Sequence, residues 1–295
     1  MNELSLDEYA RLFSKINVNW IDVSGGDIFL RDDIGGIFSL IIKSQKRLGL
    51  LHFPTNSFFI DKIYNAADYV LKNSNVKLII TISLDGPAGA HNYIRGIDNW
   101  HDSVRVYKAL KAIKSKRLEV YFGYTISNLN FNKIEQAMEE LKNEIPDIAY
   151  SDIHINIAHK SSHYYLNQSL DLDSKKIKEG VDHYLRNRKY KANLIDYLEH
   201  RYQTFIREYL NTSKTPLQCR GAVNSVFIDP EGIVFPCSIY DKSLGNLREN
   251  NYDLIHILKA KRSNDIRKQI RDKECPQCWT PCEAYQMILA SLLKI

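Results

Sequence analysis

The sequence predicts an α/β fold that ends in a small, cysteine-rich α+β region. Two observations predict this class. Strand-like and helix-like segments alternate with short connections over residues 1–160, and all five cysteines of the 295-residue chain lie after residue 215. Such alternation is typical of parallel strands joined by right-handed crossover helices. We therefore expect an α/β part over residues 1–160, a helical connection over 161–215 and a compact domain over 216–295.

The N-terminal part begins with a helix. Ser5-Leu6-Asp7-Glu8 forms a capping box, and apolar residues follow it at helical spacing. A crossover helix without a strand ahead of it suggests that the alternation began upstream of Met1. The apolar segments that we expect to be strands are 18–23, 48–53, 76–84, 118–125 and 152–157. The expected helices are 34–47, 58–72, 103–114 and 131–143, and the residues around Arg95 are expected to form a polar loop.

The second half lacks strand patterning until about residue 217. Amphipathic helices are expected over 174–188 and 193–210. The turn at Asp229-Pro-Glu-Gly232 lies between two apolar runs and predicts a hairpin of 225–228 with 233–235. A helix with a basic face is expected over 252–273, and a last helix after Cys282.

The composition excludes several classes of protein. The chain is 44% hydrophobic and 25% charged, as an ordinary globular protein is. Its net charge of +5 is too small to indicate nucleic-acid binding. No apolar run approaches the roughly 20 residues of a membrane span, and the N-terminus does not resemble a secretion signal. We expect a cytoplasmic protein with neither a nucleic-acid nor a membrane partner.

The cysteines are the most informative residues. Cys275, Cys278 and Cys282 form a Cys-x2-Cys-x3-Cys run, and Cys219 and Cys237 precede it. Soft thiolates select zinc, Cu(I) or iron–sulfur clusters. Disulfides and buried free thiols are the alternatives, and the odd count and the reducing compartment argue against disulfides. Cys275 and Cys278 share a short turn and could ligate together, whereas the N-terminal dipole of the last helix favours a thiolate at Cys282. Among the five candidate ligands we favour the set Cys219, Cys237, Cys278 and Cys282.

A second group of candidate residues follows the predicted strands. Parallel strands bring their carboxyl ends to one edge, where ligands bind in barrels and open sheets. A strand-end aspartate can instead be a helix cap, and His154 can instead be a core histidine. The candidates at this edge are Gly25, Gly26, Asp27, Asn56, Ser83, Asp85, Asn128 and His154.

Several of these motifs resemble those of radical SAM enzymes. Ser24-Gly25-Gly26-Asp27 resembles their Gly-Gly-Glu-Pro segment, with Asp27 in place of Glu and Ile28 in place of Pro. Thr55-Asn56-Ser57 resembles their Thr-Asn-Gly. The run from Ile82 to Pro87, followed by His91 and Arg95-Gly96, resembles their fourth strand and its loop. Cys219-x12-Gly232-x4-Cys237 and the closing three cysteines resemble the SPASM/twitch extension that holds auxiliary clusters.

The resemblance implies an incomplete TIM-type β/α barrel that lacks its first strand, followed by a SPASM/twitch domain. It implies an oxidoreductase that cleaves S-adenosyl-L-methionine to a 5′-deoxyadenosyl radical and modifies a peptide or small organic substrate, with an electron donor protein as a partner. By resemblance, Gly25, Gly26 and Asp27 hold the methionine ammonium, and Ser83 and Arg95 contact its polar groups. Asn56 and Asp85 lie in the same site, and Asn128 and His154 line the cavity. Five cysteines imply one auxiliary 4Fe–4S cluster.

One departure from the family affects the expected activity. No cysteine precedes Cys219, so the Cys-x3-Cys-x2-Cys loop that holds the radical-forming cluster is missing. Either the start of the chain is misassigned or truncated, which we favour, or the protein is a degenerate, non-catalytic homologue. The second alternative retains the fold and binds an iron–sulfur cluster or zinc.

Overall fold

A computed structural model describes residues 2–191 and 193–293. The chain forms two compact units, one of residues 5–155 and one that joins the residues up to Leu4 to residues 156–295. The predicted connection over 161–215 lies within the second unit. Within the described ranges, no helix has both the length and the apolar character that crossing a bilayer requires.

The first unit is built on a five-stranded sheet whose strands follow one another in chain order. Pairing from β1 to β4 is parallel, with Trp20 opposite Leu50, Leu50 opposite Lys77 and Leu78 opposite Leu118. The predicted α/β class is therefore confirmed. The strands are β1 (Trp20–Asp22), β2 (Leu50–Thr55), β3 (Lys77–Ser83), β4 (Leu118–Ile126) and β5 (Ile153–Ile157).

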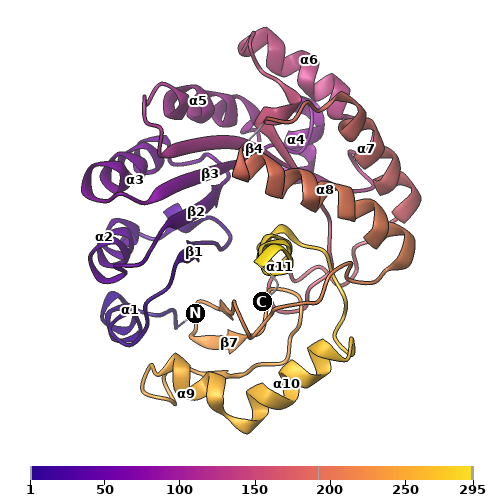
Figure 1. The fold of residues 1–295 in the computed structure, drawn as a ribbon. Coiled ribbons are helices and arrows are strands. Elements are labelled where there is room, and N and C mark those ends of the chain that lie inside the picture. The colour runs from indigo at the N-terminus through magenta and orange to yellow at the C-terminus, as the bar shows by residue number, and fades with distance from the viewer. Residues whose placement is uncertain (1, 192, 294–295) are drawn as a thin grey trace. The chain divides into compact units, whose positions relative to one another are not determined.

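Helices alternate with these strands, and α2, α3 and α5 lie along one side of the sheet (Figure 1). Alternate strand residues such as Leu51, Ile80 and Phe122 are completely buried, whereas their neighbours along each strand are half-buried. One face of the sheet therefore forms the core, and the other face carries polar side chains. The helices of this unit are α1 (Leu6–Phe13), α2 (Ile34–Ser44), α3 (Ile60–Asn73), α4 (Ala88–Arg95), α5 (Trp100–Lys111) and α6 (Ile134–Glu144).

Helix α4 corrects a prediction, because the residues around Arg95 were expected to form a loop. The helix begins after Pro87 and ends at Gly96, whose φ of 69° is the left-handed conformation of a C-cap glycine. Its polar sequence has no apolar stripe, which is why periodicity missed it. The helix places His91 and Arg95 one turn apart on the same face.

The second unit combines helices with a small antiparallel sheet of the order β6–β7–β8. The predicted hairpin is present, with Phe227 opposite Phe235. Helix α8 packs against α7 and α11. The elements are α7 (Ser174–Asn187), α8 (Leu194–Thr212), β6 (Phe227–Ile228), β7 (Ile233–Phe235), β8 (Gly245–Asn246), α9 (Leu254–Lys259), α10 (Lys261–Arg271) and α11 (Pro281–Leu293).

The single helix predicted over 252–273 is wrong, because the chain forms two helices that are separated at Ala260. Ala260 is extended, with φ −61° and ψ 152°. The Ser263 hydroxyl donates to the carbonyl of Ile257 at 2.7 Å, and the guanidinium of Arg267 donates to the carbonyl of Leu258 at 2.6 Å. These side chains satisfy carbonyls at the end of α9 that a continuous helix would use itself.

Candidate metal centre and the strand-end network

The five cysteines all lie in loops or at helix ends of the second unit. Cys219 precedes β6, Cys237 follows β7, and Cys275 and Cys278 lie between α10 and α11. Cys237 and Cys278 are buried, with 6% and 7% of their surfaces exposed. Cys219 and Cys275 are half-buried, whereas Cys282, in the first turn of α11, is exposed.

Four of the thiols influence one another electrostatically, although up to 59 residues separate them in the chain. Cys278 is the centre of this set, because its sulfur is affected by Cys219 and Cys275 and itself affects Cys237. Cys219 is also affected by Cys275. The fold thus brings the two upstream cysteines to Cys275 and Cys278. We call these four residues the thiol cluster.

Burial keeps the buried thiols protonated while no cation is bound. Burial, together with a smaller contribution from the nearby carboxylate of Glu283, raises the pKa of Cys219 to about 12. Burial likewise raises the pKa of Cys237 and of Cys278 well above that of a free thiol. Metal ions bind the thiolate form, so binding at this cluster would release protons.

Backbone N–H groups are directed at the sulfurs of the cluster. Gly221 N lies 3.4 Å from Cys219 Sγ, and Tyr240 N lies 3.3 Å from Cys237 Sγ. Hydrogen bonds of this kind favour the thiolate and tune the potential of a cluster bound to it. The donor set of soft, buried sulfurs with N–H partners therefore fits an iron–sulfur cluster.

Residues far away in the sequence anchor the segment that carries Cys278. Trp279 is completely buried, its backbone N–H donates to His159 Nε2 at 3.1 Å, and its indole donates to the carbonyl of Tyr202 at 2.8 Å. The backbone N–H of Cys278 donates to the Thr215 hydroxyl at 3.2 Å. Sequence reasoning missed these partners, because His159 lies 120 residues from Trp279 and no local motif marks it.

A buried carboxylate also belongs to this region. Glu283 is only 4% exposed, accepts a 2.8 Å hydrogen bond from the Ser225 hydroxyl, and acts on Cys219, Cys237 and Cys278. Cys282 lies within electrostatic reach of Tyr165 and Tyr202, as Cys278 does. Over residues 2–191 and 193–293, no three Cys, His, Asp or Glu side chains are close enough together to hold a single metal ion. The thiols are neighbours rather than a closed single-ion site.

In the first unit, the strand-end residues are linked to one another. Asp27 is buried, and its carboxylate accepts from Phe29 N at 2.9 Å, from the Thr55 hydroxyl at 3.0 Å and from Asn56 N at 2.9 Å. These contacts cap the short helical turn after β1 and connect it to the end of β2. A carboxylate has about four lone-pair sites, so most of the hydrogen-bond-accepting capacity of Asp27 is already used within the protein.

Asp85 forms a second centre at the end of β3. Its carboxylate accepts from Thr125 N at 2.9 Å and pairs with Arg95 at 2.6 Å. Its backbone N–H donates to His91 Nδ1 at 3.0 Å, and its carbonyl accepts from the Asn130 side chain at 2.9 Å. Asp85 is therefore bonded to β4, to α4 and to the loop after β4.

The two centres are joined through a buried histidine and an asparagine. His91 Nε2 contacts Asn99 Oδ1 at 2.9 Å, and Asn99 Nδ2 donates to the carbonyl of Asn56 at 2.7 Å. Burial lowers the pKa of His91, which favours the neutral ring that this arrangement needs. We call this chain of residues the strand-end network. It runs through Asp85, His91, Asn99, Asn56 and Asp27.

The other predicted candidates lie outside the network. Gly25 and Gly26 form an exposed bend, and a Cβ on either residue would meet no atom of the described part of the chain within 4 Å. Ser83 and Asn128 are half-buried at the ends of β3 and β4. His154 lies on the polar face of the sheet and stacks on Tyr121, with 3.7 Å between the ring centroids.

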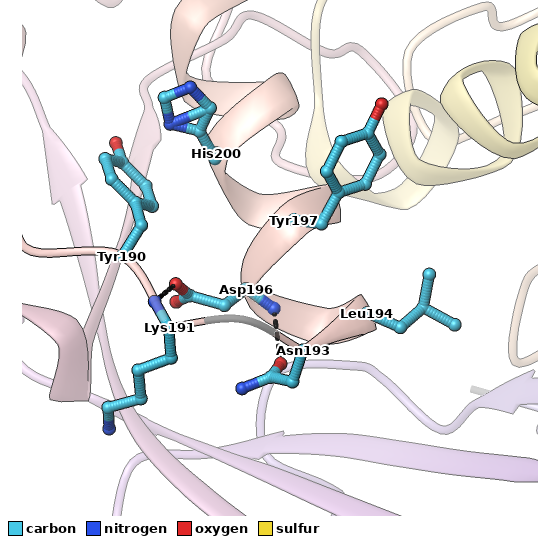
Figure 2. A pocket seen from close by; sticks show the side chains of 7 residues that line it. All are labelled: Tyr190, Lys191, Asn193, Leu194, Asp196, Tyr197 and His200. Carbon is cyan, nitrogen blue, oxygen red and sulfur yellow. Dashed lines mark hydrogen bonds between the residues drawn. The ribbon is translucent and has the colours of Figure 1, made fainter.

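A pocket in the second unit contains none of the predicted site residues (Figure 2). It has a volume of about 550 Å³. Its carboxylate, Asp196, is already bonded to Arg188 and to the backbone of Lys191, and its Asn193 caps α8. The polar side chains of this pocket therefore hold a loop and the start of α8 in place, and they are not available as reactive groups. The lining residues are Tyr190, Lys191, Asn193, Leu194, Asp196, Tyr197 and His200.

Comparison with known proteins identifies the region of the thiol cluster. Residues 219–282 match the family model of the SPASM domain, an iron–sulfur cluster-binding domain. The match begins at Cys219 and ends at Cys282, so it contains all five cysteines. A search of curated proteins found no match to the chain. The C-terminal part thus carries a SPASM-type domain, and the prediction of an iron–sulfur-binding extension is confirmed at this level.

Proposed function

We propose that the second unit binds one 4Fe–4S cluster through Cys219, Cys237, Cys275 and Cys278. The observation that carries the proposal is the gathering of these four thiols around Cys278. This set replaces Cys282 of the sequence-based set by Cys275, because Cys275 acts on Cys219 and Cys278. The SPASM match to the same segment supports it.

A bound cluster of this type accepts and donates single electrons. The chain's own residues prepare its site in three ways. The N–H groups of Gly221 and Tyr240 stabilise the thiolates, and Trp279 excludes water from the region beside Cys278. The hydrogen bond of Cys278 N to Thr215 fixes the backbone that carries the central sulfur.

Anaerobic purification followed by iron, sulfide and zinc analysis tests this proposal. We expect about four irons and four sulfides per chain, because a 4Fe–4S cluster contains these numbers. The matched variants are Cys278→Ser and Cys282→Ser. The first is expected to lose the iron, and the second is expected to retain it. One zinc per chain without iron, or equal loss in the two variants, would overturn the proposal.

We further propose that the chain is part of a radical SAM/SPASM-type oxidoreductase acting on a peptide or small organic substrate. Five strands in chain order, with β1 to β4 parallel, fit part of an incomplete β/α barrel. The exposed Gly25-Gly26 bend and the nearby Asp27 suit the approach of S-adenosyl-L-methionine to this edge. We propose that a separate donor protein would supply the electrons.

The test of this second proposal uses the reading frame upstream of codon 1. Residues 1–295 contain no Cys-x3-Cys-x2-Cys segment. Expression from an upstream start that includes such a segment, followed by reduction with dithionite, is expected to yield 5′-deoxyadenosine from S-adenosyl-L-methionine. An absence of that product from a chain loaded with iron would contradict the proposal.

One observation favours a non-catalytic alternative. At the strand ends, Asp27 already accepts three hydrogen bonds, and Arg95 is already paired with Asp85. In this alternative, Asp27 and Arg95 stabilise the fold and do not bind a substrate. The iron–sulfur domain then acts only in binding or electron transfer. This alternative predicts iron in the second unit, without cleavage of S-adenosyl-L-methionine by any form of the protein.

A further inference from the structure

The polar face of the sheet carries a set of side chains that the proposed function does not use. Asp22 on β1, His52 on β2 and Thr81 on β3 all lie on this face. Asp22 is directly opposite His52 in the register of β1 and β2. The three side chains therefore form a row across three adjacent strands.

The row is connected by two short hydrogen bonds. Asp22 Oδ1 lies 2.8 Å from His52 Nδ1, and His52 Nε2 lies 2.9 Å from Thr81 Oγ1. A carboxylate only accepts hydrogen bonds, so in the neutral imidazole His52 Nδ1 carries the proton and Nε2 carries the lone pair. The Thr81 hydroxyl then donates to Nε2. This is the arrangement of a hydroxyl, a base and a carboxylate that orients the base.

Neighbouring residues fix this geometry. The indole of Trp20 donates to Asp22 Oδ1 at 3.0 Å and holds the carboxylate in place. Gly123 is opposite Ser83 in the sheet, and a Cβ on Gly123 would lie 2.5 Å from Thr81 Cγ2. Glycine at this position makes room for the methyl group of Thr81. The hydroxyl is thereby left to point at His52.

Exposure distinguishes His52 from the structural histidine of the strand-end network. The side chains of His52 and Asp22 are 26% and 29% exposed, so a small molecule can reach them. His91 has the same number of ring contacts, but it is completely buried. An oriented base that solvent can reach is suited to proton transfer.

The rest of the face limits the chemistry further. Lys77 pairs with Glu119 at 2.8 Å, Tyr121 donates to Glu119 at 3.2 Å, and His154 stacks on Tyr121. A polar ligand would therefore meet both signs of charge and an aromatic ring beside the row. Backbone N–H groups near Thr81 are used within the paired strands, so none forms an oxyanion hole. Proton transfer is favoured over acyl transfer.

We propose that His52 is a general base for a polar ligand that binds on this face of the sheet. The O–H or N–H of the ligand gives its proton to Thr81 Oγ1, while the Thr81 hydroxyl proton passes to His52 Nε2. The ligand loses one proton, the imidazole gains it, and Asp22 stabilises the imidazolium. This goes beyond the proposed iron–sulfur function and does not depend on it, because no residue of 219–282 takes part.

Diethyl pyrocarbonate tests the proposal on the full chain. The lone pair of an accessible imidazole forms a bond to its carbonyl carbon, and ethyl carbonate leaves. Peptide mass spectrometry measures the rate at each of the nine histidines. His52 is expected to react at least as fast as the exposed His256, although it is only about a quarter exposed. A rate as slow as that of the buried His91 would overturn the proposal.

Two variants separate an oriented base from a merely exposed ring. Asp22→Asn is expected to slow labelling of His52 at least tenfold. The amide has no negative charge to stabilise a positively charged imidazole, and its N–H group can donate to Nδ1, which places the ring proton on Nε2. Thr81→Val removes the hydroxyl but keeps the shape, and it is expected to leave His52 reactive. Circular dichroism confirms that each variant folds. An unchanged rate in Asp22→Asn, or loss of labelling in a folded Thr81→Val, contradicts the proposal.

Discussion

Removal of the Asp85 carboxylate should destabilise the first unit by about 3 kcal/mol. Asp85 is 3% exposed, and its carboxylate accepts from Thr125 N and pairs with Arg95. A hydrogen bond to a charged group contributes about 1.5–3 kcal/mol. The Arg95 side chain is 31% exposed, so solvent screens the ion pair and it adds at most about 1 kcal/mol. In Asp85→Ala the backbone contacts to His91 and Asn130 remain, so we expect the fold to persist.

Urea unfolding measures this loss. Trp100 is only 2% exposed and belongs to the same unit, so its fluorescence reports the unfolding of residues 5–155. The matched control is Asp68→Ala, which removes an exposed ion pair with Lys72 on α3. The control should lose less than about 0.5 kcal/mol. A loss below about 1 kcal/mol in Asp85→Ala, or equal losses in the two variants, would refute the reasoning.

Three further predictions concern single residues. Ser57 is completely buried, has φ 73°, and its hydroxyl finds no hydrogen-bond partner among residues 2–191 and 193–293. Ser57→Gly should therefore stabilise the protein by about 1 kcal/mol in urea unfolding, and a loss of stability would contradict this. Burial raises the pKa of Glu199 from 4.5 to about 7, so its contribution to stability is full below pH 4.5 and is lost as pH rises through about 7. The loss should be about 3 kcal/mol, and Glu199→Gln should flatten the measured pH profile; an unchanged profile would show that another group titrates. Gly123→Ala places a Cβ against Thr81 and should lower stability by about 2 kcal/mol in thermal unfolding, and a neutral result would contradict the close approach.

Local pattern predicted most of the fold, and the errors occurred where tertiary contacts decide. The apolar runs of β2 and β3 are a strong local signal, and both strands were predicted within two residues of their ends. The break between α9 and α10 has no Gly or Pro to mark it. It depends on the side chains of Ser263 and Arg267, which occupy carbonyls of the preceding helix. Sequence periodicity contains no information about such contacts.

The candidate site shows the same division: its local motifs could be predicted from the sequence, whereas its tertiary contacts could not. Three cysteines within eight residues are a local signal, and the fold adds Cys219 and Cys237 to them. Glu283 was missed, because a single Glu at the start of a helix is a common feature. At the strand ends, topology predicted that Asp27 and Asp85 would share an edge. It could not predict that the intervening residues would bond them together.

The hydrogen bonds of the strand-end network all run in one direction. Asp85 donates to His91, His91 donates to Asn99, Asn99 donates to the carbonyl of Asn56, and Asn56 donates to Asp27. Reversing one amide, or adding a second proton to the imidazole, would set two donors or two acceptors against each other. The series of donors and acceptors therefore has one polarity, which ends at the carboxylate of Asp27 in the turn after β1. Each member of the strand-end network thus fixes the hydrogen-bond orientation of the next, from the end of β3 to the turn after β1.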